Sequence, residues 1–181
     1  MSLQTWSTPK MEKVEQLSQI MDNLGIPANA QIALLGNIHV ETGGTYDYKA
    51  QQKGGKGYGL LQMDYHKKPY FDDLKANKLK DSPENQLSYF LDTIYGNKQD
   101  IIGRGNAAQL RKAIETEQDP AKLTGIMSDL WFKPGKPNMD QRLEAARMYT
   151  PTAQQAPVNT GLDELMGGFG YLKDMFNFGK P

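Results

Sequence analysis

A single glutamate, Glu41, stands at the end of a predicted helix, where its carboxyl group could act as an acid. The helix is predicted over residues 29–41 by apolar side chains on one face, Ile32, Leu35 and Ile38. Asn29 is the expected N-cap, and Gly43 with Gly44 is expected to end the helix. The negative end of the helix dipole and a partly apolar site would both raise the pKa of Glu41. A carboxyl group that stays protonated near neutral pH can protonate a leaving-group oxygen.

Two motifs surround this glutamate. The first is Gly36-Asn37-Ile38-His39-Val40-Glu41-Thr42-Gly43, and the second is Tyr58-Gly59-Leu60-Leu61-Gln62. Together they resemble the phage tail lysozyme family of the lysozyme-like superfamily, in which GN-x-x-x-E-[ST]-G ends a helix and YGL-x-Q follows a short β region. Lytic transglycosylases share a related pattern, so the resemblance leaves hydrolysis and transglycosylation both open.

The resemblance extends over residues 10–150. It includes a Q-L-x-Y run at residues 86–89 and an R-x-x-x-A-x-x-Y run formed by Arg142, Ala146 and Tyr149. Residues 131–134 stand where relatives often carry [YF]-E-R-P, but this chain has no glutamate there, so no acid is implied at that place. Relatives also often have a tryptophan after the YGL-x-Q glutamine, where this chain has Met63.

The expected fold is mainly α, an α+β lysozyme-like domain over residues 1–150. A small, irregular β-hairpin is predicted at residues 44–58, beside the active-site cleft, with its glycine turn at 54–55. Further helices are predicted to begin at six places: Thr8-Pro9, Pro69, Ser82-Pro83, Asn106, Asp119-Pro120 and Asn138. Residues 151–161 are predicted to be a flexible linker, and residues 162–181 an amphipathic C-terminal segment.

Cleavage of a glycosidic bond requires a proton donor, predicted to be Glu41, and usually a second carboxylate. Asp47 is the main candidate for the second group and Asp64 the other, while a mechanism with one glutamate needs neither. The predicted substrate-binding residues are Thr42, Tyr46, Tyr58, Gly59 and Gln62. The roles of Gly59 and Gln62 are implied by the resemblance. Their chemistry is suitable, because glycine allows close approach of the backbone and glutamine can bind sugar hydroxyls. The tyrosines could stack on sugars or cover the helix below, and Thr42 could bind the acid or cap the helix.

Composition excludes several classes of function. Lys+Arg and Asp+Glu both number 21, so no overall field attracts nucleic acid, and no apolar run is long enough to span a membrane. The chain has no cysteine and no G-x-S-x-G elbow, which argues against peptidase and esterase chemistry. Its two histidines, His39 and His66, have no metal-ligand spacing with acidic residues, so neither a metal nor another cofactor is expected.

The resemblance implies a phage enzyme that cleaves the glycan strands of peptidoglycan so that the phage can cross the cell wall. No secretory signal is visible at residues 1–10, so delivery by a holin or within a virion to the host periplasm is expected. Residues 162–178 could dock on the domain or bind another virion or tail protein. The alternatives are a lytic transglycosylase giving 1,6-anhydro products and a non-enzymatic virion protein with the same fold.

Overall fold

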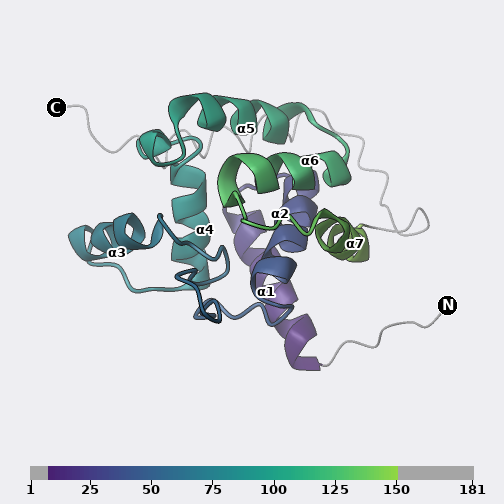
Figure 1. Cartoon of the computed structure of the whole chain (residues 1–181), viewed down its shortest axis with the longest axis horizontal. Coiled ribbons are helices and arrows are strands. Elements are labelled where there is room, and N and C mark those ends of the chain that lie inside the picture. Colours follow the sequence, from purple (N-terminus) through teal and green to yellow (C-terminus); the bar gives the residue numbers. More distant parts are fainter. Residues whose placement is uncertain (1–7, 151–181) are drawn as a thin grey trace.

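The computed structural model describes residues 8–150 and is mainly helical, as predicted. The elements follow in the order α1 (Thr8–Asn23), α2 (Ala28–Glu41), α3 (Lys67–Ala76), α4 (Pro83–Asp92), the 3₁₀ turn η1 (Gln99–Ile101), α5 (Arg104–Thr116), α6 (Pro120–Met127), the π-helical turn η2 (Ser128–Phe132) and α7 (Met139–Tyr149). Figure 1 shows α2 near the middle of this body, with α5 and α6 along one side and the connection 42–66 on the other. The predicted linker and C-terminal segment, 151–181, lie outside the described residues.

Helix α2 forms the centre of the core. Its residues are almost all buried from Ala30 to Ile38, and it packs mainly against α6 and α7. A helix that is apolar on every side is stable only when other elements surround it. The predicted N-cap was wrong: α2 begins at Ala28, and the N-cap residue is Pro27, which has φ −58° with an extended ψ of 146° and no side-chain capping bond. The side chain of Asn29 instead donates to Gln118 Oε1 at 3.3 Å.

The predicted β-hairpin was also wrong. Within residues 8–150 the only pairing of this kind is an isolated antiparallel bridge between Gln51 and Tyr58. The backbone before it cannot extend, because Tyr46 has φ 52° and a tight turn brings Ala50 N within 3.0 Å of Asp47 O. The segment is therefore an irregular connection with one rung of sheet-like pairing.

Two of the predicted helix starts were confirmed together with a side-chain cap. Ser82 accepts from Asn85 N at 3.1 Å at the start of α4, and Asp119 accepts from Ala121 N at 2.9 Å at the start of α6. Helix α5 begins at Arg104, before the expected Asn106, because Gly103 turns the chain with φ 90°.

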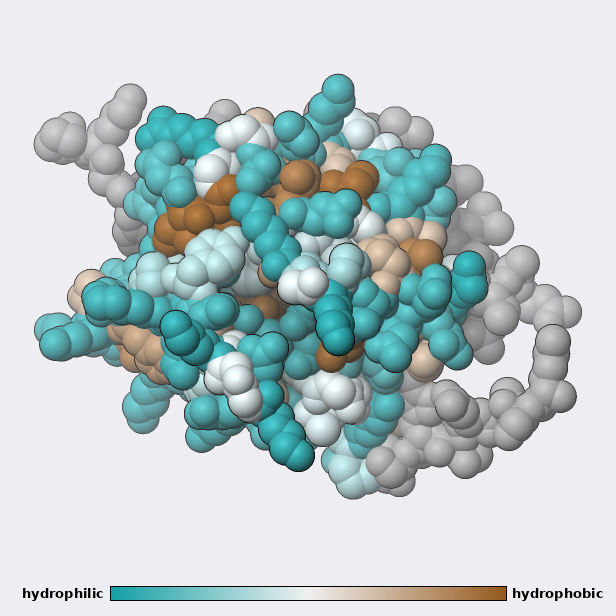
Figure 2. Space-filling model, in the orientation of Figure 1, coloured by the Kyte–Doolittle hydropathy of each residue, from teal (hydrophilic) through white to brown (hydrophobic). Residues whose placement is uncertain are grey.

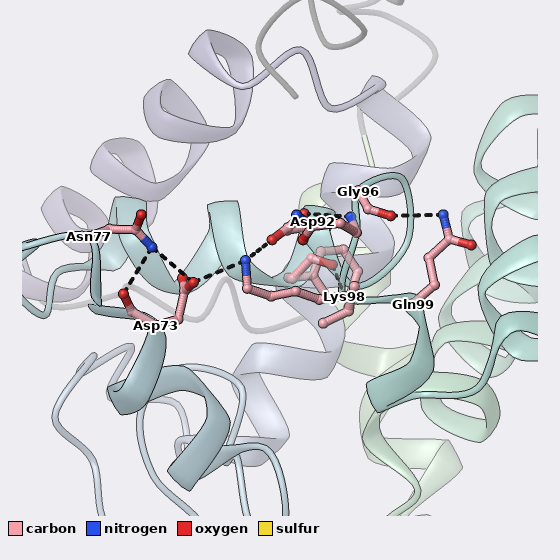
Figure 3. A network of polar contacts seen from close by, with 9 residues as sticks. Asp73, Asn77, Asp92, Gly96, Lys98 and Gln99 are labelled. Atoms are coloured by element: carbon pink, nitrogen blue, oxygen red, sulfur yellow. Dashed lines mark hydrogen bonds and ion pairs between the residues drawn. The ribbon is translucent and has the colours of Figure 1, made fainter. Parts of the chain in front are cut away.

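A closed polar cluster joins α3 to the end of α4 (Figure 3). Lys98 Nζ lies 3.1 Å from Asp73 Oδ1 and also pairs with Asp92. The other oxygen of Asp92 accepts from Asn97 N at 3.1 Å. Both carboxylates thus have partners, and the cluster ties α3 to the rest of the body.

The surface is mostly polar. Figure 2 shows hydrophilic residues over most of one face, with an apolar band in the region of α5 and α6. Within residues 8–150 no helix is long and apolar enough to cross a membrane.

Candidate active site

Glu41 is the last residue of α2, and the turn after it has a defined geometry. Gly43 and Gly44 both adopt positive φ, 59° and 73°, which ends the helix as predicted. Thr42 Oγ1 donates to the carbonyl oxygen of Ile38 at 2.8 Å and accepts from Tyr46 N at 3.1 Å. This threonine therefore connects the last turn of α2 to the following segment. Its two bonds fix the position at which the helix ends, and with it the backbone of Glu41.

The partner of Glu41 is a buried arginine from α7. Arg142 Nη2 donates to Glu41 Oε1 at 2.6 Å, and the arginine side chain is only 1% exposed. Its other nitrogens are also paired, Nη1 with Asn37 Oδ1 at 2.8 Å and Nε with Pro137 O at 2.7 Å. The guanidinium carbon lies 5.7 Å from the ring centre of Phe132. A guanidinium held at three nitrogens fixes the position of the carboxylate that it binds.

Asn37 links this pair to the core. Its Nδ2 donates to Ala33 O at 2.9 Å, one turn earlier in α2, and to Thr124 O at 3.2 Å in α6. Since these contacts fix the amide, its Oδ1 must point at Arg142. Three helices therefore contribute to the orientation of one carboxyl group.

Gly36 allows α7 to approach α2 closely enough for these bonds. A Cβ atom at this position would lie 2.8 Å from the backbone oxygen of Arg142 and 2.9 Å from the Cβ of Ala146. Both distances are shorter than normal van der Waals contact, and one neighbour is backbone. The glycine is thus needed for the close packing of the two helices that bring Glu41 and Arg142 together.

Glu41 borders a cavity of about 860 Å³. The lining comes from the end of α2 and the turn after it (residues 40–43), the connection (residues 50–53, 62 and 64), the end of η2 with the loop before α7 (residues 132–136 and 138) and Arg142. This volume is in the range of cavities that bind small molecules.

Burial raises the pKa of Glu41, while the hydrogen bond and the charge of Arg142 act in the opposite direction. The Glu41 side chain is 15% exposed. Of its two carboxyl oxygens, only Oε1 has a hydrogen-bond partner within residues 8–150. The sequence predicted a raised pKa from the dipole and an apolar site, but not the opposing arginine. The second oxygen, Oε2, has no such partner in the described residues and can therefore carry the proton of the acid.

A family model described as phage tail lysozyme matches residues 12–152. The chain belongs to the phage tail lysozyme family. Membership indicates a phage-associated, lysozyme-like glycosidase that acts on the peptidoglycan of the cell wall. Comparison with curated proteins and with solved structures gave no match.

In this tail-lysozyme domain, three predicted site residues lie together. Glu41, Thr42 and Gln62 all line the cavity, and so does Asp64, the alternative second carboxylate. Gln62 has φ 44°, which is uncommon for a residue with a side chain. Its Nε2 donates to Gly59 O at 2.9 Å, whereas no donor among the described residues reaches its Oε1.

Asp47 and Tyr46 lie outside the cavity lining. Asp47 Oδ1 accepts from Lys49 N at 3.0 Å, an interaction typical of aspartate in turns. Tyr46 is buried, and its hydroxyl lies 2.6 Å from His39 Nδ1 and also contacts the Tyr149 hydroxyl. Their predicted roles in catalysis and sugar binding stay predictions.

Tyr58 and Gly59 also pack away from the cavity. The Tyr58 hydroxyl donates to Asp81, and the residue is 8% exposed. A Cβ at Gly59, where φ is 80°, would lie 2.4 Å from Gln86 Oε1. That oxygen accepts from Leu60 N at 2.9 Å. The absence of a side chain at Gly59 therefore allows Gln86 to hydrogen-bond the backbone of the connection.

Sequence reasoning missed Arg142 and Asn37 as parts of the site. Asn37 belongs to the GN pair of the first motif, and Arg142 begins the R-x-x-x-A-x-x-Y motif. Their presence in these motifs was the one sequence feature that could have pointed to a role in the site. Among residues 8–150 there is no group of three or more His, Asp or Glu side chains arranged to hold a metal ion.

Proposed function

We propose that this protein is a muramidase-type peptidoglycan hydrolase, carried by the phage virion and acting in the host periplasm. It cleaves the β-1,4 bond between N-acetylmuramic acid and N-acetylglucosamine, with Glu41 as the proton donor. The observation that carries the proposal is the state of Glu41: one carboxyl oxygen is held by a buried arginine, and the residue borders a cavity large enough for sugars.

The chemistry follows from this geometry. Protonated at Oε2, Glu41 gives its proton to the glycosidic oxygen as the bond to the anomeric carbon breaks. The carboxylate that forms lies against Arg142, which is already 2.6 Å from Oε1. Because the negative charge on Glu41 grows in the transition state, Arg142 stabilises that state more than the protonated ground state.

A hydrolase with two carboxylates also needs a group to activate water or stabilise the sugar cation. Asp64 lines the same cavity as Glu41 and is exposed, which supports it for this role. Asp47 stays a second candidate for this role, because it follows Glu41 by six residues in the sequence. Substitution of each aspartate by asparagine separates them: the required one should lower kcat by about 10²-fold or more.

A lytic transglycosylase is the second candidate function. Among the described residues that line the cavity, Glu41 and Asp64 are the only carboxylates. A mechanism in which the C6 hydroxyl of the sugar attacks requires just one of them, so Glu41 alone would suffice. The product distinguishes the two reactions, because hydrolysis leaves a reducing end and transglycosylation a 1,6-anhydro end.

The decisive experiment is turbidity clearing of purified Gram-negative peptidoglycan, with mass spectrometry of the released fragments. Glu41→Gln keeps the shape and removes the proton, so it should lower the rate by about 10²- to 10⁴-fold. Glu12→Gln, at an exposed position in α1, is the matched control and should clear at the wild-type rate. A folded wild type that releases no fragments would instead support a non-enzymatic virion protein.

A further inference from the structure

The rim of the cavity has a positive charge that the whole chain lacks. Lys53, from the connection, and Lys133 and Lys136, from the loop before α7, all line the cavity and are exposed. None of the three forms an ion pair with another residue in the range 8–150. We refer to these three residues as the lysine rim.

The charges around the cavity do not balance. The lysine rim and Arg142 contribute four cations, against the carboxyl groups of Glu41 and Asp64. Arg142 is already committed to Glu41, and a single exposed aspartate remains for three lysines. Over the entire chain, by contrast, Lys+Arg equals Asp+Glu at 21 each. The excess is therefore local, and it attracts an anionic part of a ligand in this cavity.

The backbone holds one rim lysine in an unusual conformation. Lys133 has φ 45° and ψ 50°, and its N–H donates to Ser128 O at 2.8 Å, which closes η2. Glycine or asparagine adopts this left-handed conformation at lower cost than lysine does. Pro134 follows directly and restricts the loop further. The Lys133 Cα is thus fixed at the edge of the cavity while its long side chain extends into solvent.

We propose that the lysine rim binds carboxylates of the peptide stems on the glycan, so that stem-bearing strands bind more tightly than bare glycan. This inference rests on the proposed function, because it takes peptidoglycan as the ligand of the cavity. The sugar rings of peptidoglycan are uncharged, and the stems attached to the lactyl group carry its carboxylates beside the scissile bond. Ammonium groups on flexible stems suit peptide carboxylates whose positions vary from strand to strand.

The test measures binding of soluble peptidoglycan oligosaccharides with stems and of uncharged chitooligosaccharides of the same length, since removal of the stems by an amidase would expose the lactyl carboxylates. Titration calorimetry with Glu41→Gln protein avoids turnover. We expect several-fold tighter binding of the stem-bearing form, and we expect this preference to shrink as ionic strength rises. In the same background, Lys133→Gln/Lys136→Gln should reduce the preference by about two- to threefold.

Two matched controls are available. Lys112→Gln/Lys122→Gln removes the same charge from exposed positions on α5 and α6 and should keep the preference. Lys53→Gln can be compared with Lys56→Gln, which lies in the same exposed stretch but does not line the cavity. Circular dichroism and a thermal melt confirm that each variant is folded.

Equal binding of the two oligosaccharides, or an unchanged preference in the Lys133/Lys136 variant, would overturn the inference. Tighter binding of a stem-free glycan that carries a phosphodiester would assign the rim to phosphate and also overturn it. Cleavage by the wild type is measured separately, so a protein that shows rim-dependent binding without cleavage would refute the proposed hydrolysis alone.

Discussion

Two clusters in this protein pair a largely buried cation with carboxylates, and they differ in what they leave free. Lys98 lies between Asp73 and Asp92, and the carboxylates have further partners in the surrounding backbone and side chains (Figure 3). Arg142 holds one oxygen of Glu41, and the other oxygen has no hydrogen-bond partner in the described structure. The first cluster is closed, whereas the second borders a cavity.

The pKa values show the same contrast. Burial by itself would lower the pKa of Lys98, but hydrogen bonds to Asp92 and Asp73 outweigh it and the pKa is raised, which favours the charged lysine. Burial raises the pKa of Glu41 despite Arg142, which favours the uncharged acid. Both shifts are upward, yet one strengthens an ion pair and the other suits the proton donor that we propose. The Lys98 cluster supplies enough partners for every charge, whereas the Arg142 cluster leaves one oxygen of Glu41 without a partner, as the proposed acid would require.

The largest effect on stability should come from Arg142→Met. It leaves Glu41, Asn37 and the Pro137 carbonyl without their donor in a buried place, so we expect a loss of about 3–5 kcal/mol in the free energy of unfolding. Urea denaturation measures it. Arg147→Met, an exposed change on the same helix, should stay within about 0.5 kcal/mol. A similar loss in both variants would mean that charge on α7, and not the buried contacts, is responsible.

Lys98→Met should break the closed cluster and leave the Arg142–Glu41 pair intact. Asp73 and Asp92 would then share a partly buried place without a cation, and we expect a loss of about 1–3 kcal/mol. The rate of peptidoglycan clearing, measured well below the melting temperature, should match the wild type. A fall in the rate of clearing would remove the functional distinction between the clusters.

Gly36→Ala tests whether the spacing of the helices positions Glu41. The added methyl group meets the backbone of α7, and we expect a loss of about 1–3 kcal/mol with a lower kcat. Gly105→Ala, at a position near the start of α5 with open space around it, is the control and should not reduce either quantity. Normal stability and activity in the Gly36→Ala variant would show that α7 can shift without disturbing the site.

The pH dependence should give the smallest effects, in two separate windows. The native state holds the Glu41 proton more tightly than the unfolded chain, so its contribution to stability is present at low pH and is lost as pH rises through the raised pKa. Activity that needs the protonated acid should decline over the same window. The contribution of Lys98 is lost only in the alkaline range, as pH rises through its own raised pKa. Urea midpoints against pH should lose the first slope in Glu41→Gln and the second in Lys98→Met.

Local patterns in the sequence were sufficient for much of the fold. The apolar spacing around Ile38 predicted α2, the glycines at 43 and 44 predicted its end, and Ser82 and Asp119 predicted two helix starts. These features depend on neighbours within one or two turns. The prediction of a hairpin at 44–58 was wrong because it, too, used only neighbouring residues. Alternating residue types suggested strands, but the backbone turns at Tyr46 and Asp47 and buries Tyr46.

The sequence by itself determined a mainly helical, family-typical domain and the placing of one glutamate at the end of a buried helix. Only the tertiary structure decided how that glutamate is controlled. Arg142 is 101 residues away along the chain and reaches Glu41 because Gly36 lets α7 pack against α2. The lysine rim likewise assembles from two distant segments. Pairing, burial and local charge depend on which residues meet in space, and one-dimensional spacing does not specify that.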